Sequence, residues 1–108
     1  MIIIFNYYII INMEKIGERG RAKFLIVKDN NNYKFYVRSP YFGNAKSVKA
    51  PIWKNGDSPG DFNTFSGPSN GRYYFSKNIY IKGIYNFHVY YINSASVQIY
   101  LDEIRFKV

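Results

Sequence analysis

The chain of 108 residues is long enough for one domain with a single buried core, and its formal net charge is +8. Aromatic residues make up 20% of the chain, with 12 Tyr and 9 Phe, whereas Leu occurs only at Leu25 and Leu101. This composition favours pleated strands over helices and predicts an all-β fold. The lack of Cys excludes disulfides, thiolate metal sites and a cysteine nucleophile, and the positive charge favours an anionic partner.

The N-terminal segment, residues 1–21, differs from the rest of the chain. Its first twelve residues, MIIIFNYYIIIN, are apolar but too short to span a bilayer, and they lack the basic start and the cleavage site of a signal peptide. A polar stretch follows from Met13. Three interpretations of residues 1–12 stay open: the remnant of an export signal, a strand at a sheet edge, or a region upstream of a translation start at Met13.

From residue 22 onward, short apolar runs are separated by turn residues, which is the spacing of a β-sandwich or barrel. The first run, AKFLIV (22–27), ends at the turn-forming DNNN (29–32). The second run, YKFYVR (33–38), alternates cleanly and places Phe35 and Val37 on its inward face. Residues 22–108 are therefore predicted to form the folded domain.

The third run, AKSVKAPIW (45–53), contains Pro51, which cannot donate to a strand ladder and marks an edge or a bulge. A bulge at this proline would turn both Val48 and Trp53 inward. The following residues, 57–71, contain many Gly and Pro and predict a loop with a short strand at 62–65.

The last third of the chain predicts three more strands. RYYFSKNIYI (72–81) is one strand or a bent pair, and GIYNFHVYYI (83–92) alternates between inward apolar residues and outward polar ones. In SVQIYL (96–101) the inward residues are Val97, Ile99 and Leu101, and the polar pair that follows shifts the register.

About seven strands with a Trp on the third and a Tyr near the start of the sixth match an immunoglobulin-like antiparallel β-sandwich. Tyr85 is expected to donate its hydroxyl to the preceding turn, and Phe87 to fill the space between the sheets against Trp53. The core predicted from these strands consists of Phe35, Val37, Val48, Trp53, Tyr85, Phe87, Val89, Val97, Ile99 and Leu101.

Three sequence blocks resemble a known family. They are YKFYV (33–37), AKSVKAPIW (45–53) in place of SVxFPxW, and GIYNFHVYY (83–91) in place of GxYxIHVYY. In this order and spacing, which spans residues 22–103, the chain is similar to the Bsp-like repeat of group B streptococcal surface proteins. It departs from that pattern at Ala50, where the family has Phe, and in the longer loop that follows. The resemblance implies an extracellular, immunoglobulin-like accessory module of Gram-positive surface proteins and cell-wall hydrolases, with no catalytic residues of its own.

The residues give little support to catalysis. The single His88 has no Ser, Cys or carboxylate motif beside it, and the seven scattered carboxylates show no metal-ligand spacing. No Gly-rich loop joins a strand to a helix, so no nucleotide site is predicted. We expect no enzyme activity, no metal and no cofactor.

Binding on an outward sheet face is the better functional hypothesis. If the third, sixth and seventh strands share a sheet, its outer face presents tyrosine rings beside amide and basic donors, which suit sugar rings or an anionic polymer. The candidate ligand-binding residues are Lys49, Asn86, His88, Tyr90, Gln98 and Tyr100. The expected partner is a cell-wall polymer or another anionic glycan, bound outside the cell or at the cell wall. A spacer or adhesion role is the simpler version of this function.

Two alternatives stand beside this hypothesis. A basic aromatic face could bind single-stranded nucleic acid, and the protein would then be cytoplasmic if residues 1–12 are not an export remnant. No signature of a nucleic-acid-binding fold is present, so this is the less favoured function. For His88 alone, a structural hydrogen bond to a neighbouring group is the preferred interpretation.

Overall fold

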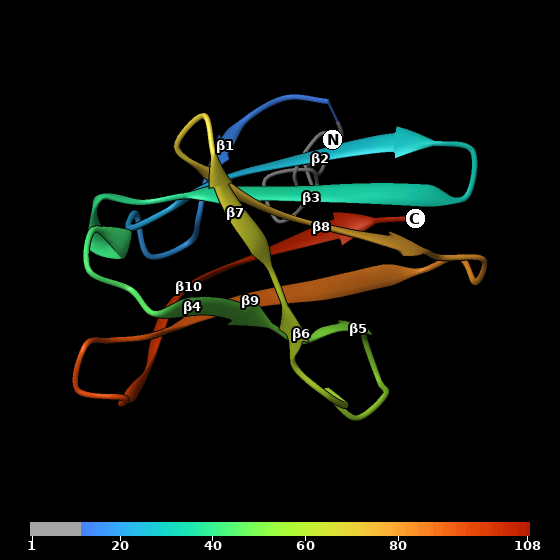
Figure 1. The fold of residues 1–108 in the computed structure, drawn as a ribbon. Coiled ribbons are helices and arrows are strands. Elements are labelled where there is room, and N and C mark those ends of the chain that lie inside the picture. The colour runs from blue at the N-terminus through green and yellow to red at the C-terminus, as the bar shows by residue number, and fades with distance from the viewer. Residues whose placement is uncertain (1–11) are drawn as a thin grey trace.

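Two antiparallel sheets face each other in the computed structural model, which describes residues 12–108 (Figure 1). The first sheet has the order β1-β2-β3-β8-β7, with β1 (Lys15–Ile16), β2 (Lys23–Asp29), β3 (Asn32–Arg38), β8 (Arg72–Asn78) and β7 (Ser66–Ser69). The second has the order β10-β9-β4-β6, with β10 (Gln98–Lys107), β9 (Ile84–Ile92), β4 (Ser47–Ala50) and β6 (Asn63–Thr64), and β5 (Ile52–Lys54) also pairs with β9. A short 3-10 helix, Pro40–Phe42, follows β3.

The predicted antiparallel β-sandwich is confirmed, but the described residues form ten strands rather than about seven. The run 45–53 is divided at Pro51 into β4 and β5, and the loop 57–71 supplies the short strand β6 and the strand β7. The strand β1 lies before residue 22, the predicted start of the folded domain, and it pairs with β2 at the edge of the first sheet.

Phenylalanine rings from both sheets fill the space between the two layers. Phe87 on β9 meets Phe24 and Phe35 of the facing sheet in edge-to-face contacts, with ring centroids 5.1 and 5.3 Å apart. Phe35 also meets Phe106 of β10 at 5.4 Å, and all four rings are fully buried. Edge-to-face pairs are favourable because the positive ring edge meets the negative ring face. These contacts attach β9, which pairs with β10 on one side and with β4 and β5 on the other, to the facing sheet.

Most of the predicted core residues are buried between the sheets. They are Phe35, Val37, Val48, Tyr85, Phe87, Val89 and Leu101. The Tyr85 hydroxyl donates to the carbonyl oxygen of Ile81 at 2.7 Å, which closes the turn before β9. β10 contains the predicted register shift, a bulge between Tyr100 and Asp102.

Trp53 does not belong to the core, and the bulge predicted at Pro51 is wrong. Lys49 lies opposite Tyr90 and Ile52 lies opposite Phe87, so the register on β9 is the same on both sides of the proline. Strict alternation therefore continues, and it turns Trp53 outward. Phe65, which precedes β7, packs against Phe87 in addition to Phe24 and Phe35, with ring centroids 5.7 Å apart.

The start of β10 also differs from the prediction. Val97 is 52% exposed because it closes the hairpin turn, where its backbone N–H donates to the Asn93 side chain at 3.0 Å. Ile99, opposite Tyr91, is only half-buried. The inward placement of Val97 was therefore wrong, since β10 begins only at Gln98.

The described part of the N-terminal segment is joined to the sandwich, so the boundary expected at residue 22 does not separate it. β1 pairs with β2, and the fully buried carboxylate of Asp102 accepts the backbone N–H groups of Arg19, Arg21 and Ala22 at 2.7 to 2.9 Å, and that of Glu103 at 2.8 Å. A buried charge is tolerable when it receives several hydrogen bonds. The three interpretations of the apolar segment concern residues 1–12, of which residues 1–11 lie outside the described part.

Candidate functional site

The outer face of the second sheet carries a row of aromatic side chains in mutual contact. Alternation along β9 turns His88 and Tyr90 to this face, because Phe87 and Val89 are committed to the core. Tyr100 lies directly opposite Tyr90 on β10. We call the five side chains Trp53, Phe62, His88, Tyr90 and Tyr100 the aromatic strip.

The rings of the aromatic strip touch one another in sequence. Trp53 meets His88 with ring centroids 4.7 Å apart, and His88 meets Tyr100 at 5.9 Å. Tyr100 meets Tyr90 at 5.3 Å, and Tyr90 meets Phe62 at 4.9 Å. One continuous surface therefore combines the hairpin of β9 and β10 with a region distant in sequence, β5 and the loop before β6.

A carboxylate fixes the centre of the aromatic strip. The Tyr100 hydroxyl donates to Glu103, and the other Glu103 oxygen lies 3.2 Å from His88 Nε2. Burial, together with this carboxylate, raises the pKa of Tyr100, so its hydroxyl stays protonated and remains a donor. Burial lowers the pKa of His88, although Glu103 and Glu18 act in the opposite direction. Partial burial of the ring is the larger of these effects, so the imidazole is mostly neutral near pH 7.

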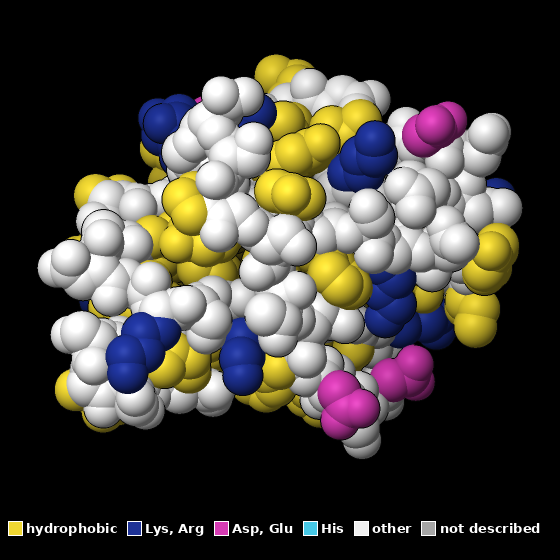
Figure 2. All heavy atoms as spheres, viewed as in Figure 1, with side chains coloured by type: hydrophobic (Ala, Val, Ile, Leu, Met, Phe, Trp, Pro, Cys, Tyr) yellow, Lys and Arg dark blue, Asp and Glu magenta, His cyan; other side chains and the backbone are white. Residues whose placement is uncertain are grey.

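Cationic side chains border the aromatic strip. The Arg19 guanidinium lies 5.2 Å from the Tyr100 ring centroid, within cation–π distance. Lys49 on β4 lies opposite Tyr90 on β9. Arg105 on β10 lies opposite Asn86, which precedes His88 by two residues on β9. Elsewhere, the Lys and Arg side chains visible in Figure 2 are spread among hydrophobic ones and do not form one patch. Cations beside exposed rings are suited to ligands that combine an apolar ring face with negative charge.

Four of the six candidate residues come together in this site. Lys49, His88, Tyr90 and Tyr100 are neighbours on the outer face. Asn86 is on the same face but only 6% exposed, and its side chain donates to Asn55 Oδ1 at 3.4 Å. Gln98 is exposed opposite Ile92, at the hairpin end of β10.

Sequence reasoning missed five members of the site. Trp53 was assigned to the core on the assumption of a bulge, and Phe62 lies in a Gly- and Pro-rich loop without periodicity. Arg19 lies in the segment placed outside the domain. Glu103 and Arg105 could have been found, because alternation beyond the bulge of β10 places both beside the outward residues of β9.

The described residues contain neither a metal-holding cluster nor a membrane-spanning helix. Among residues 12–108, no group of three or more His, Asp or Glu side chains is placed to hold a metal ion. No helix within this range is long and apolar enough to cross a membrane. Comparison of the chain with family models, with curated proteins and with solved structures gives no match.

Proposed function

We propose that this protein is a non-catalytic module of the cell surface or cell wall, and that its aromatic strip binds envelope glycan. One observation carries the proposal: five aromatic side chains, partly or largely exposed, are in contact on the outer sheet face, with cations at their border. A polar network holds the two central rings in place, so little side-chain freedom is lost when a ligand binds.

Glycan is the ligand class that this surface suits. The apolar faces of sugar rings stack on aromatic side chains, and polar groups beside them fix orientation. In the strip, Tyr90 and Tyr100 supply the stacking faces, while Lys49 and Arg19 supply donors for hydroxyl or anionic groups.

The resemblance to the Bsp-like repeat supports the same location. Its third block, GIYNFHVYY (83–91), contains β9 and therefore His88 and Tyr90 of the aromatic strip. That resemblance favours an extracellular or wall-associated accessory role. If the aromatic strip binds no glycan, only the spacer role remains of this proposal.

The chemistry around His88 favours binding over catalysis. Its imidazole lies against Trp53 and Tyr100, and its polar partner is Glu103 rather than a hydroxyl or thiol nucleophile. Glu103 is itself occupied by the Tyr100 hydroxyl. A general base needs a proton to remove within hydrogen-bond distance, and this pair serves instead to orient two rings.

Retention on purified peptidoglycan tests the proposal. We expect the protein to sediment with insoluble peptidoglycan and to remain bound at moderate salt, since ring stacking is less sensitive to screening than ion pairing. The double variant Tyr90→Ala/Tyr100→Ala should lose retention at least about tenfold while its melting transition stays cooperative.

The matched control is Tyr74→Ala/Tyr80→Ala, which removes two tyrosines that are 42% and 69% exposed away from the strip. It should retain full binding. Equal losses in the two double variants would place the binding surface elsewhere. Steeply salt-dependent binding to single-stranded DNA, without retention on peptidoglycan, would replace this function with nucleic-acid binding.

A further inference from the structure

A basic groove lies on the first sheet's side of the molecule, outside the aromatic strip. Its volume is about 500 Å³, and its walls come from the N-terminal loop and β2, from the end of β3 with the short 3-10 helix, and from the turn between β7 and β8. We call it the basic groove and define it by Ile16, Arg21, Lys23, Arg38, Ser39 and Tyr41.

The groove holds two cations, Arg21 and Lys23, that form no ion pair within the described residues. Glu14 is shared by Arg38, in a two-pronged pair at 2.7 and 2.8 Å, and by Arg72 at 3.5 Å. The hydrogen bond from Arg38 lowers the pKa of Glu14, with smaller contributions from the charges of Arg72 and Lys23, so this carboxylate stays ionised. The ion pairs formed within residues 12–108 include neither Arg21 nor Lys23, and both side chains are exposed.

The backbone that carries Arg21 is fixed on both sides. Its N–H donates to the buried carboxylate of Asp102 at 2.9 Å, and its carbonyl oxygen accepts the Ser39 hydroxyl at 2.7 Å. A Cβ added at Gly17 would collide with the same carboxylate, so the loop follows Asp102 closely. Lys23 is held in β2, opposite Arg38. The two free cations therefore extend from a rigid frame, which limits the entropy lost when they bind an anion.

Apolar side chains line the same groove. Ile16 is 62% exposed and Tyr41 is 52% exposed, and both lie within its wall. A small inorganic ion needs no such wall, whereas a sugar that carries an anionic group would use both the cations and the Tyr41 ring.

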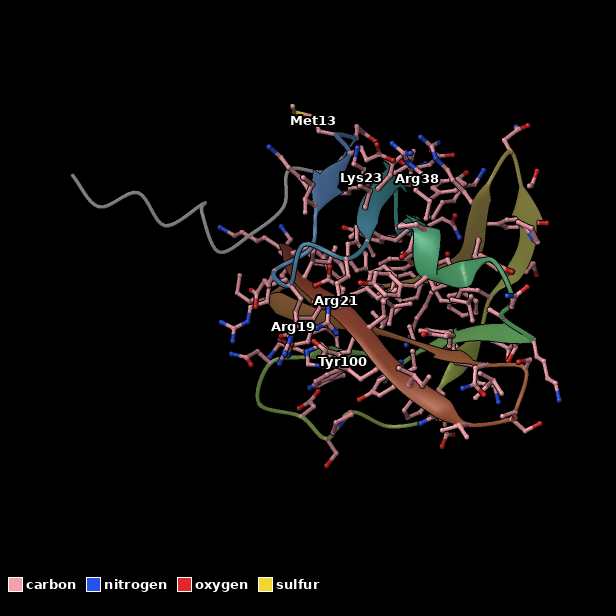
Figure 3. The ribbon with its side chains drawn as sticks, turned by 90° about the vertical axis from the view of Figure 1, so that its left-hand side faces the viewer. Met13, Arg19, Arg21, Lys23, Arg38 and Tyr100 are labelled. Atoms are coloured by element: carbon pink, nitrogen blue, oxygen red, sulfur yellow. The ribbon has the colours of Figure 1, made fainter. Side chains whose placement is uncertain are left out.

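The N-terminal loop connects the basic groove to the aromatic strip. Arg19 contacts Tyr100, and Arg21, two residues later, lines the groove. In the view of Figure 3, Arg19 and Arg21 lie between Lys23 and Arg38 on one side and Tyr100 on the other. Asp102 accepts the backbone N–H groups of both loop arginines, so it sets their positions together.

From this geometry we propose that the basic groove is a second binding site, for an anionic oxygen group carried by an envelope glycan. The group is a phosphate or a carboxylate, bound by Arg21 through its guanidinium fork and by Lys23 as a point charge. This inference rests on the proposed function, because it assigns to the aromatic strip a ligand that is an anionic polymer rather than a neutral one.

The test uses Gram-positive cell-wall sacculi in two forms: untreated, and stripped of phosphodiester-linked polymers with hydrofluoric acid. The full chain is compared with Arg21→Gln/Lys23→Gln, and with the control Lys34→Gln/Lys77→Gln, which removes the same charge from exposed positions on β3 and β8. Circular dichroism and a melting curve establish that each variant is folded.

The expected result is that Arg21→Gln/Lys23→Gln binds untreated sacculi about tenfold more weakly than the full chain, while the control pair binds within about twofold of it. Stripping should lower binding of the full chain to the level of the groove variant if the group is a phosphate. If the group is a carboxylate, stripping changes nothing and the groove variant is weak on both forms.

Three outcomes would overturn the inference. Equal binding by the groove variant and its control would remove the basic groove as a site and leave glycan binding by the aromatic strip intact. Absence of binding to both forms of sacculi, even by the full chain, would remove the proposed function as well. Loss of single-stranded DNA binding in the groove variant, without any sacculus binding, would assign the groove to nucleic acid instead.

Discussion

The inward and outward faces of β9 carry similar aromatic residues in very different surroundings. On the inward face, Phe87 is fully buried and its ring contacts the edges or faces of Phe24, Phe35 and Phe65. On the outward face, Tyr90 contacts Phe62 and Tyr100, yet its ring stays partly exposed. Both faces form ring clusters, so the presence of such clusters does not distinguish packing from binding. The distinguishing features are exposure and the polar groups beside the rings.

The same contrast holds between neighbouring carboxylates on β10. Asp102 is fully buried and accepts four backbone N–H groups, so it fixes the chain. Glu103 faces outward and contacts two side chains of the aromatic strip. The bulge between Tyr100 and Asp102 produces this division, because it turns Leu101 and Asp102 to the inside together. Inward groups should therefore govern stability, and outward groups ligand binding.

The largest effect should come from truncating the inward ring. Phe87→Ala removes a fully buried ring at the centre of the core and should lower the free energy of unfolding by about 3 to 5 kcal/mol. Tyr90→Ala, on the opposite face, should lower it by about 1 kcal/mol. Urea denaturation measures both. Should Phe87→Ala fail to fold, Phe87→Leu preserves the comparison, and a cost no larger than that of Tyr90→Ala would contradict it.

Loss of the buried carboxylate should have the next largest effect. Asp102→Ala leaves the N–H groups of Arg19, Arg21 and Ala22 without their acceptor and should cost about 3 kcal/mol. Hydrogen exchange at these three amides should accelerate more than exchange in β3. Glu103→Ala is the outward control, and it should cost far less. Equal costs would mean that the N-terminal loop is not held by Asp102.

The Tyr85 hydroxyl offers a smaller and sharper test of the inward face. Tyr85→Phe removes only the hydrogen bond to the Ile81 carbonyl oxygen and should cost about 1 to 2 kcal/mol. Tyr90→Phe is the outward counterpart, and its stability should be nearly unchanged. A melting series in which Tyr85→Phe matches the parent protein would show that this turn needs no such bond.

Alternation in the sequence was sufficient to predict the strands whose two faces differ. In β3, apolar and polar residues alternate, and the predicted inward residues Phe35 and Val37 are buried. The same signal placed His88, Tyr90 and Tyr100 on one outward face, because the bulge of β10 falls after Tyr100.

The remaining features depend on contacts between segments that are distant in sequence. The alternation of apolar and polar residues within one strand cannot predict such contacts. The inward placement of Trp53 depends on a bulge at Pro51, although the register on β9 continues without a break through this proline. The roles of Arg19 and Asp102 arise only when the N-terminal loop and β10 are adjacent, at sequence separations above 80 residues. A lone Asp or Arg in a polar stretch carries no local signature of such a pairing.

His88 provides the smallest expected effect, a pH dependence that belongs to the outward face. The unfolded chain takes up a proton near the ordinary pKa of 6.5, whereas burial lowers the pKa of His88 in the folded chain. Stability contributed by the neutral imidazole is therefore fully present above pH 6.5 and is lost as the pH falls through the folded pKa. Glu103 and Glu18 oppose this loss, and Arg105 adds to it.

Urea denaturation between about pH 7.5 and about pH 5 measures this effect. We expect the free energy of unfolding to depend less steeply on pH for His88→Gln than for the parent protein. If the parent protein instead gains stability relative to His88→Gln as the pH falls, the ion pair with Glu103 outweighs burial, and the aromatic strip is charged when it binds.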